Sequence, residues 1–139
     1  MPLSNPTSKC EALPSDLIHW TEGRALVAAG SPFDPVTYQG RTYQVAQANN
    51  ALIFPGLGLG VKVARASRVS DRMLAASADA VAALSDATTV GASLLPSVDQ
   101  LRMVSAAVGV GVAQAADSEG LAQADLYNPV QQKIGRAHV

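Results

Sequence analysis

The sequence predicts an α/β fold that is mostly helical, with one strand end near the N-terminus and one β-hairpin. Apolar residues recur at helical spacing over most of the 139 residues, which predicts amphipathic helices. Between residues 36 and 45, two short segments of strand-forming residues flank Gln39-Gly40, a pattern typical of a hairpin. Pro6 keeps Asn5 extended. We therefore expect Asn5 at a strand end, where open α/β sheets bind ligands.

The composition indicates one packed globular domain and excludes several classes of partner. Hydrophobic residues make up 48% of the chain and charged residues 15%, with a formal net charge of -1. Because the net charge is near zero and no basic patch is interleaved with aromatic residues, we expect neither nucleic acid nor an acidic membrane surface as a partner. No apolar run approaches the ~20 residues that cross a bilayer. The single cysteine, Cys10, excludes an internal disulfide and a cysteine-based metal site, and it favours a reducing, cytoplasmic location.

We expect four helices, each with one apolar face. The first is expected from about Asp16 to Ala29, with Ser15 as its N-cap and Gly30 at its end. The others are expected over about residues 52–66, 71–84 and 98–118. The predicted core faces are Leu17, Trp20, Ala25 and Ala28 in the first helix, Leu74, Ser77, Val81 and Leu84 in the third, and Leu101, Val104, Val108, Val112 and Ala115 in the fourth.

The stretch Gln47–Gly60 holds two adjacent amides, Asn49 and Asn50, directly before an apolar run and a glycine cluster. Asparagine is poor inside helices and strands, so the pair marks a junction that can hold a small polar ligand. The run Gly56-Leu57-Gly58-Leu59-Gly60 has GxGxG spacing and lacks the GxGxxG spacing of a dinucleotide fingerprint. We therefore expect these glycines to allow close helix packing.

Four strings of this sequence resemble the malic enzyme family. They are Leu3-Ser4-Asn5-Pro6-Thr7-Ser8, Trp20-Thr21-Glu22-Gly23-Arg24-Ala25, Gly30-Ser31-Pro32-Phe33 and Gln47–Gly60. By this resemblance, residues 1–121 are expected to be the C-terminal part of a Rossmann-like NAD(P)-binding domain. The sequence departs from the family at Ala48, where glycine is usual, and this affects the geometry beside the amides.

The resemblance implies oxidative decarboxylation of malate to pyruvate and carbon dioxide, with reduction of NAD or NADP and a divalent magnesium or manganese ion. It implies substrate contacts by Asn5, Asn49 and Asn50, with Asn5 also contacting the cofactor. In the family, the acidic metal ligands and the lysine and tyrosine that transfer protons precede the Asn5 motif. No catalytic or metal-binding residue is therefore assigned here. Family members form dimers or tetramers, so a homo-oligomer is expected.

Two alternative functions stay open at this point: a malolactic relative that converts malate to lactate, and a non-catalytic helical packing module. The Asn5 motif lies deep inside the family's chain, so the sequence is expected to be a fragment. Residues 122–133 match the family poorly and form an unassigned tail. Residues 134–139 correspond to the translation of a common sequencing-adapter string, so we expect them to be an artefact.

Overall fold

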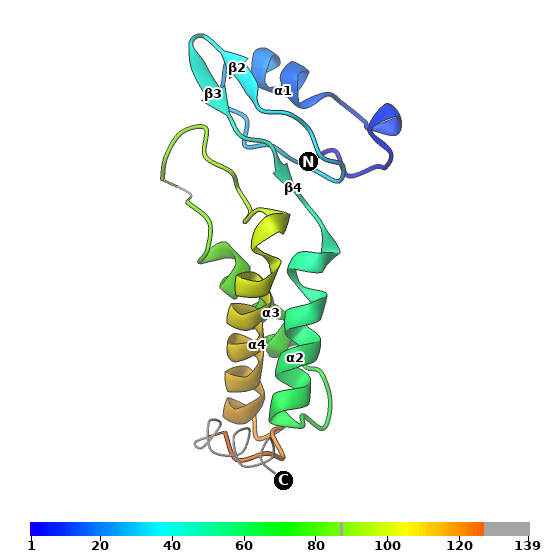
Figure 1. Cartoon of the computed structure of the whole chain (residues 1–139), viewed down its shortest axis with the longest axis vertical. Coiled ribbons are helices and arrows are strands. Elements are labelled where there is room, and N and C mark those ends of the chain that lie inside the picture. Colours follow the sequence, from blue (N-terminus) through cyan, green and yellow to red (C-terminus); the bar gives the residue numbers. More distant parts are fainter. Residues whose placement is uncertain (87, 127–139) are drawn as a thin grey trace.

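The computed structural model describes residues 1–86 and 88–126 and has two parts arranged along one long axis (Figure 1). Short strands and helix α1 (Pro14–Trp20) form one part, which contains the N-terminus. Three longer helices form the other part. The predicted adapter segment 134–139 and residues 127–133 of the unassigned tail lie outside the described residues. Within the described ranges, no helix combines the length and apolar character needed to span a bilayer.

A short parallel pairing forms the centre of the first part. Strand β1 (Ala28–Ala29) pairs in parallel with β4 (Ala46–Gln47). The N-terminal segment lies on the other side, because the Gly30 N–H donates to the Pro2 carbonyl oxygen at 2.9 Å. The predicted strand end at Asn5 is thus an extended segment beside β1, although no regular strand is formed there.

The predicted hairpin is present as strands β2 (Val36–Tyr38) and β3 (Arg41–Tyr43), which pair antiparallel. Gln39 and Gly40 form the turn with φ angles of 48° and 75°. Two successive positive φ angles match the twist of a two-residue hairpin. A small apolar cluster beneath the hairpin contains Ile18 of α1, Val27 and Tyr43, so the hairpin is fixed on α1.

The first predicted helix is wrong in its bounds. Helix α1 spans Pro14–Trp20 and starts with Pro14, so Ser15 is not the N-cap. The helix stops because Glu22 and Gly23 take positive φ angles of 54° and 75°. The Gly23 N–H then donates back to the Ile18 carbonyl at 2.8 Å, which closes the helix end.

The early end of α1 also changes which side chains are buried. Trp20, predicted to face the core, is 71% exposed, so this prediction is wrong. Ala28 is buried as predicted, but it lies in strand β1 and not in a helix. Gly30 therefore follows a strand and does not end a helix.

Helix α4 (Leu101–Ser118) is central to the second part and packs against both α2 (Phe54–Ala64) and α3 (Asp71–Ala82). Two short 3-10 turns precede α2 and α4, over Asn50–Leu52 and Val98–Gln100. The predicted stripe of α4 is confirmed at Val104, Val108 and Val112, which are fully buried, and at buried Ala115. Leu101 is partly buried against the same cluster.

The start of α3 is predicted correctly, and its buried face is partly wrong. The Ser70 side chain caps the helix by accepting a hydrogen bond from the Met73 N–H at 3.2 Å. The buried residues are Met73, Ser77 and Val81, which are spaced four apart. Leu74, predicted to face the core, is 47% exposed, so this prediction is wrong. The buried face of α3 contains its neighbour Met73 instead.

The glycine run lies inside α2, where it allows the close packing that the sequence predicts. A Cβ at Gly56 would lie 2.5 Å from the Val108 Cβ, and one at Gly60 would lie 2.6 Å from the Val112 Cβ. Real Cβ atoms do not approach each other this closely, so both positions require glycine for α2 and α4 to touch. Gly58 has no neighbour within 4 Å of such an atom.

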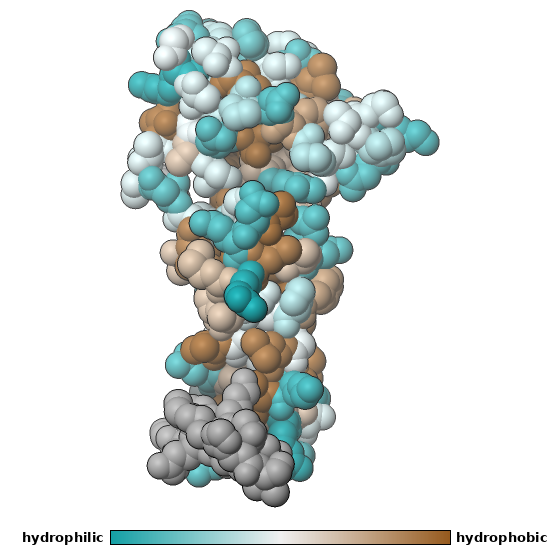
Figure 2. Space-filling model, viewed as in Figure 1, coloured by the Kyte–Doolittle hydropathy of each residue, from teal (hydrophilic) through white to brown (hydrophobic). Residues whose placement is uncertain are grey.

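The α2–α4 pair has an apolar surface that the described residues leave partly exposed. Figure 2 shows apolar side chains among polar ones on the surface of the helical part. Leu59 is 40% exposed and Val110 57%. These two residues line a groove of about 370 Å³ between α2 and α4.

The glycine run gives a prediction with an internal control. Gly60→Ala should lower the free energy of unfolding by about 1–3 kcal/mol, because the new methyl group overpacks α4. Gly58→Ala should raise it by about 0.8–1 kcal/mol, because alanine favours the helix and meets no neighbour. Urea unfolding of the purified chain measures both changes. Equal effects at the two positions would contradict the proposed packing.

Candidate functional site

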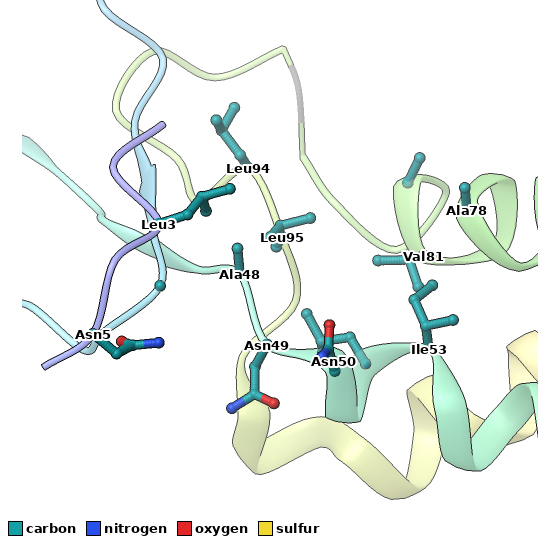
Figure 3. Close-up of a pocket in the computed structure, with 13 residues that line it drawn as sticks. Leu3, Asn5, Ala48, Asn49, Asn50, Ile53, Ala78, Val81, Leu94 and Leu95 are labelled. Atoms are coloured by element: carbon teal, nitrogen blue, oxygen red, sulfur yellow. The ribbon is translucent and has the colours of Figure 1, made fainter. Parts of the chain in front are cut away.

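A cleft of about 630 Å³ lies between the two parts of the structure (Figure 3). Three chain segments end at it: the N-terminal segment at Asn5, strand β1 at Gly30, and strand β4 at Ala48–Asn50. Helix α3 and the segment before α4 supply apolar side chains, including Val81 and Leu95. The cleft therefore lies at the carboxyl ends of adjacent extended segments, as ligand sites in α/β sheets do.

Asn5 is held by Ser31, the second residue after β1. The Ser31 hydroxyl donates a hydrogen bond to Asn5 Oδ1. Ser31 itself is buried, with 5% of its surface exposed. In Figure 3 the amide nitrogen of Asn5 is directed into the cleft.

The backbone just before Asn5 is fixed by a carboxylate. The Ser4 N–H donates to both oxygens of Glu11 at 3.2 Å, and the Ser4 hydroxyl donates to Oε1 at 2.5 Å. The Ser4 hydroxyl, followed by backbone N–H groups, lowers the pKa of Glu11. The carboxylate is therefore ionised at neutral pH and holds the segment that ends at Asn5.

Asn49 and Asn50 form the turn between β4 and α2. The Ala48 N–H donates to the Ala29 carbonyl at 2.8 Å, so the strand pairing continues up to the amides. Asn49 is extended and accepts a hydrogen bond from the Ala51 N–H on its Oδ1 at 2.9 Å. Asn50 is exposed and begins the 3-10 turn.

The structure brings all three predicted site residues, Asn5, Asn49 and Asn50, to one cleft. Their role in binding stays a prediction. Sequence reasoning did not identify Ser31 or Gly30 as part of this region. Both lie in the string Gly30-Ser31-Pro32-Phe33, and recognising Ala28–Ala29 as a strand would have placed them at the same edge.

The cleft offers neutral hydrogen-bonding groups on an apolar wall. None of the described residues that line it is ionisable. Amides donate and accept hydrogen bonds, but they do not transfer protons near neutral pH. These residues can thus bind and orient a small polar ligand, whereas general acid or base chemistry requires other groups.

The described residues do not fit a metal site or a dinucleotide phosphate loop. Over residues 1–86 and 88–126, no group of three or more His, Cys, Asp or Glu side chains could hold a metal ion. The glycine run lies within α2 and packs against α4, so its backbone does not form a phosphate-binding loop.

Comparisons with known proteins give a consistent family. The family model described as "Malic enzyme, NAD binding domain" matches residues 1–117. The chain is 51% identical over 131 residues to NAD-dependent malic enzyme 3 of Bacillus subtilis, which covers 94% of this chain and 23% of that protein. It is 54% identical over 122 residues to an NAD-dependent malic enzyme of Shewanella denitrificans, covering 87% of this chain and 22% of the relative.

A solved structure with a similar fold is the malic enzyme from Pyrococcus horikoshii. The TM-score is 0.70 at 26% sequence identity, and the match covers 98% of this chain and 31% of that one. This similarity and the family match support the predicted fold class, a partial Rossmann-like domain that is mostly helical. The chain thus spans less than a quarter of the length of the two relatives named above.

The contact between Gly30 and the N-terminal segment gives a prediction for this edge. A Cβ at Gly30 would lie 2.3 Å from the Leu3 carbonyl oxygen, and backbone cannot move aside cheaply. Gly30→Ala should destabilise the chain by about 1–3 kcal/mol. It should also speed hydrogen exchange of the residue-30 amide, because the added methyl group weakens the hydrogen bond from this N–H to the Pro2 carbonyl. Exchange as slow as in the unchanged chain would show that the segment does not pack here. Gly58→Ala is the control.

Proposed function

The chain belongs to the malic enzyme family, and on this premise we propose that it forms the substrate-facing part of an enzyme that oxidises and decarboxylates malate. The products are pyruvate and carbon dioxide, and NAD is reduced. The observation that supports this proposal is that Asn5, Asn49 and Asn50, far apart in the sequence, line one cleft. A small ligand can touch them together only in such an arrangement.

The chemistry of malate suits these residues. Malate has two carboxylates and one hydroxyl group, and amides can hydrogen-bond to each of them without adding charge. Asn50 also begins the 3-10 turn that leads into α2, and the positive dipole end of that helix favours an anion. In this proposal, the three amides orient malate within the cleft, and the apolar residues Val81 and Leu95 exclude water from one side.

The cofactor assignment rests on the relatives. The relatives from Bacillus subtilis and Shewanella denitrificans are named NAD-dependent, which favours NAD over NADP. Asn5 is the proposed cofactor contact within this chain. Because the described residues provide no metal-ligand set, we propose that the magnesium or manganese ion is held by residues outside them. Assembly as a homo-oligomer and a cytoplasmic location belong to the same proposal.

A segment replacement tests the proposed function. In the Bacillus subtilis relative, the matching segment is exchanged for this chain, which gives a full-length chimera. We expect malate-dependent formation of NADH that requires magnesium or manganese. The 139-residue chain alone should show no such activity. A folded chimera without activity, or an active isolated chain, would contradict the proposal, and circular dichroism monitors folding.

Substitutions at Asn50 test the binding role in this chimera. Asn50→Ala should raise KM for malate about 10-fold to 100-fold, because a hydrogen bond to a charged group is worth ~1.5–3 kcal/mol. Asn50→Asp should raise KM further. Aspartate has the same shape as asparagine, but it places a negative charge next to a carboxylate of the substrate. Steady-state kinetics measure both. Gln123→Glu, at an exposed amide outside the cleft, controls for added charge. Unchanged malate turnover in Asn50→Asp would refute the role.

A further inference from the structure

Two amides of the cleft have their oxygen atoms occupied by donors from the chain itself. Asn5 Oδ1 accepts from the Ser31 hydroxyl, and Asn49 Oδ1 accepts from the Ala51 N–H at 2.9 Å. A backbone N–H can only donate, so the orientation of the Asn49 amide is determined by its partner. Among the described residues, neither NH2 group has a hydrogen-bond partner.

This pattern determines what the cleft can recognise. An NH2 group is a hydrogen-bond donor only, so two such groups are matched to a ligand with acceptor oxygens. Carboxylate oxygens are the strongest acceptors of this kind, because hydrogen bonds to an ionised group are shorter and stronger. If the Asn5 amide rotated by half a turn, its oxygen would face the cleft and repel a carboxylate.

We propose that Ser31 is a positioning residue, which holds the Asn5 amide so that its NH2 group faces a carboxylate of the substrate. Ser31 does not line the cleft and acts through Asn5. Its burial supports this role, because a buried hydroxyl is held in one place by its surroundings. Glu11 fixes the backbone before Asn5, and Ser31 fixes the side chain. The inference rests on the proposed function.

Kinetics of the full-length chimera provide the first test. Ser31→Ala should raise KM for malate about threefold to tenfold, because one oriented hydrogen bond is weakened. The change in kcat should be smaller, because the lost hydrogen bond stabilises the bound substrate and the transition state to the same extent. Ser77→Ala is the matched control: Ser77 is also buried, and its hydroxyl donates to the Met73 carbonyl at 2.9 Å inside α3. It should lower the unfolding temperature but leave KM unchanged.

A double-mutant cycle separates positioning from a general structural role. In an Asn5→Ala background, Ser31→Ala should have no further effect on KM, because Ser31 acts only through the Asn5 amide. The proposal is overturned if Ser31→Ala leaves KM unchanged. It is also overturned if the substitution raises KM by the same factor with and without Asn5.

Nuclear magnetic resonance provides a test that does not depend on activity. In the 15N-labelled chain of 14.3 kDa, relaxation of the Asn5 side-chain amide should report an ordered group. Ser31→Ala should make this amide mobile on the picosecond-to-nanosecond timescale, and Ser77→Ala should not. An Asn5 amide that stays ordered in Ser31→Ala overturns the positioning role. An inactive unmutated chimera instead overturns the proposed function, and relaxation still decides whether Ser31 holds Asn5.

Discussion

The hydrogen bonds on the two sides of strand β1 determine where the cleft lies. Gly30 N–H binds the Pro2 carbonyl on one side, and Ala48 N–H binds the Ala29 carbonyl on the other. These bonds bring together three segments that are distant in the sequence, and the carboxyl ends of all three lie at the cleft. A side chain at Gly30 would clash with the Leu3 carbonyl oxygen. The position of the Asn5 backbone relative to the other two amides thus depends on hydrogen bonds between backbone groups.

The second constraint is the close contact between α2 and α4, which determines where the Asn49-Asn50 turn points. Gly56 and Gly60 place α2 directly against Val108 and Val112. The turn at Asn50–Leu52 joins α2 with only Ile53 between them. The packing of the helices therefore determines the start of α2, and strand β4 determines the other end of the turn. Because both ends are held, the amides need little further support, which a single capping bond to Asn49 provides.

Much of the fold could be predicted from the sequence where the signal is local. The hairpin turn at Gln39-Gly40, the cap at Ser70 and the stripe of α4 each follow from residue type and spacing. The end of α1 could not, because Glu22 takes a positive φ that its residue type disfavours. Strand β1 has only two residues, and its conformation depends on partners far away in the sequence. The three amides were found from their motifs, but Ser31 was missed because its role depends on that strand.

In the proposed function, the groups that bind the substrate are separate from the groups that transfer protons. The described residues around the cleft are neutral or apolar, and the nearby carboxylate of Glu11 is engaged by Ser4 in holding the backbone. An ionisable side chain at the amide positions would change its charge with pH, and with it its interaction with an anionic ligand. Amides keep the same hydrogen-bonding pattern across the pH range. Under the proposed function, the ligand is oriented by groups whose protonation state does not change while other groups transfer protons. For such a site the direction of each amide is the variable that matters. A backbone N–H, which can only donate, determines it for Asn49, and the Ser31 hydroxyl is the partner of Asn5.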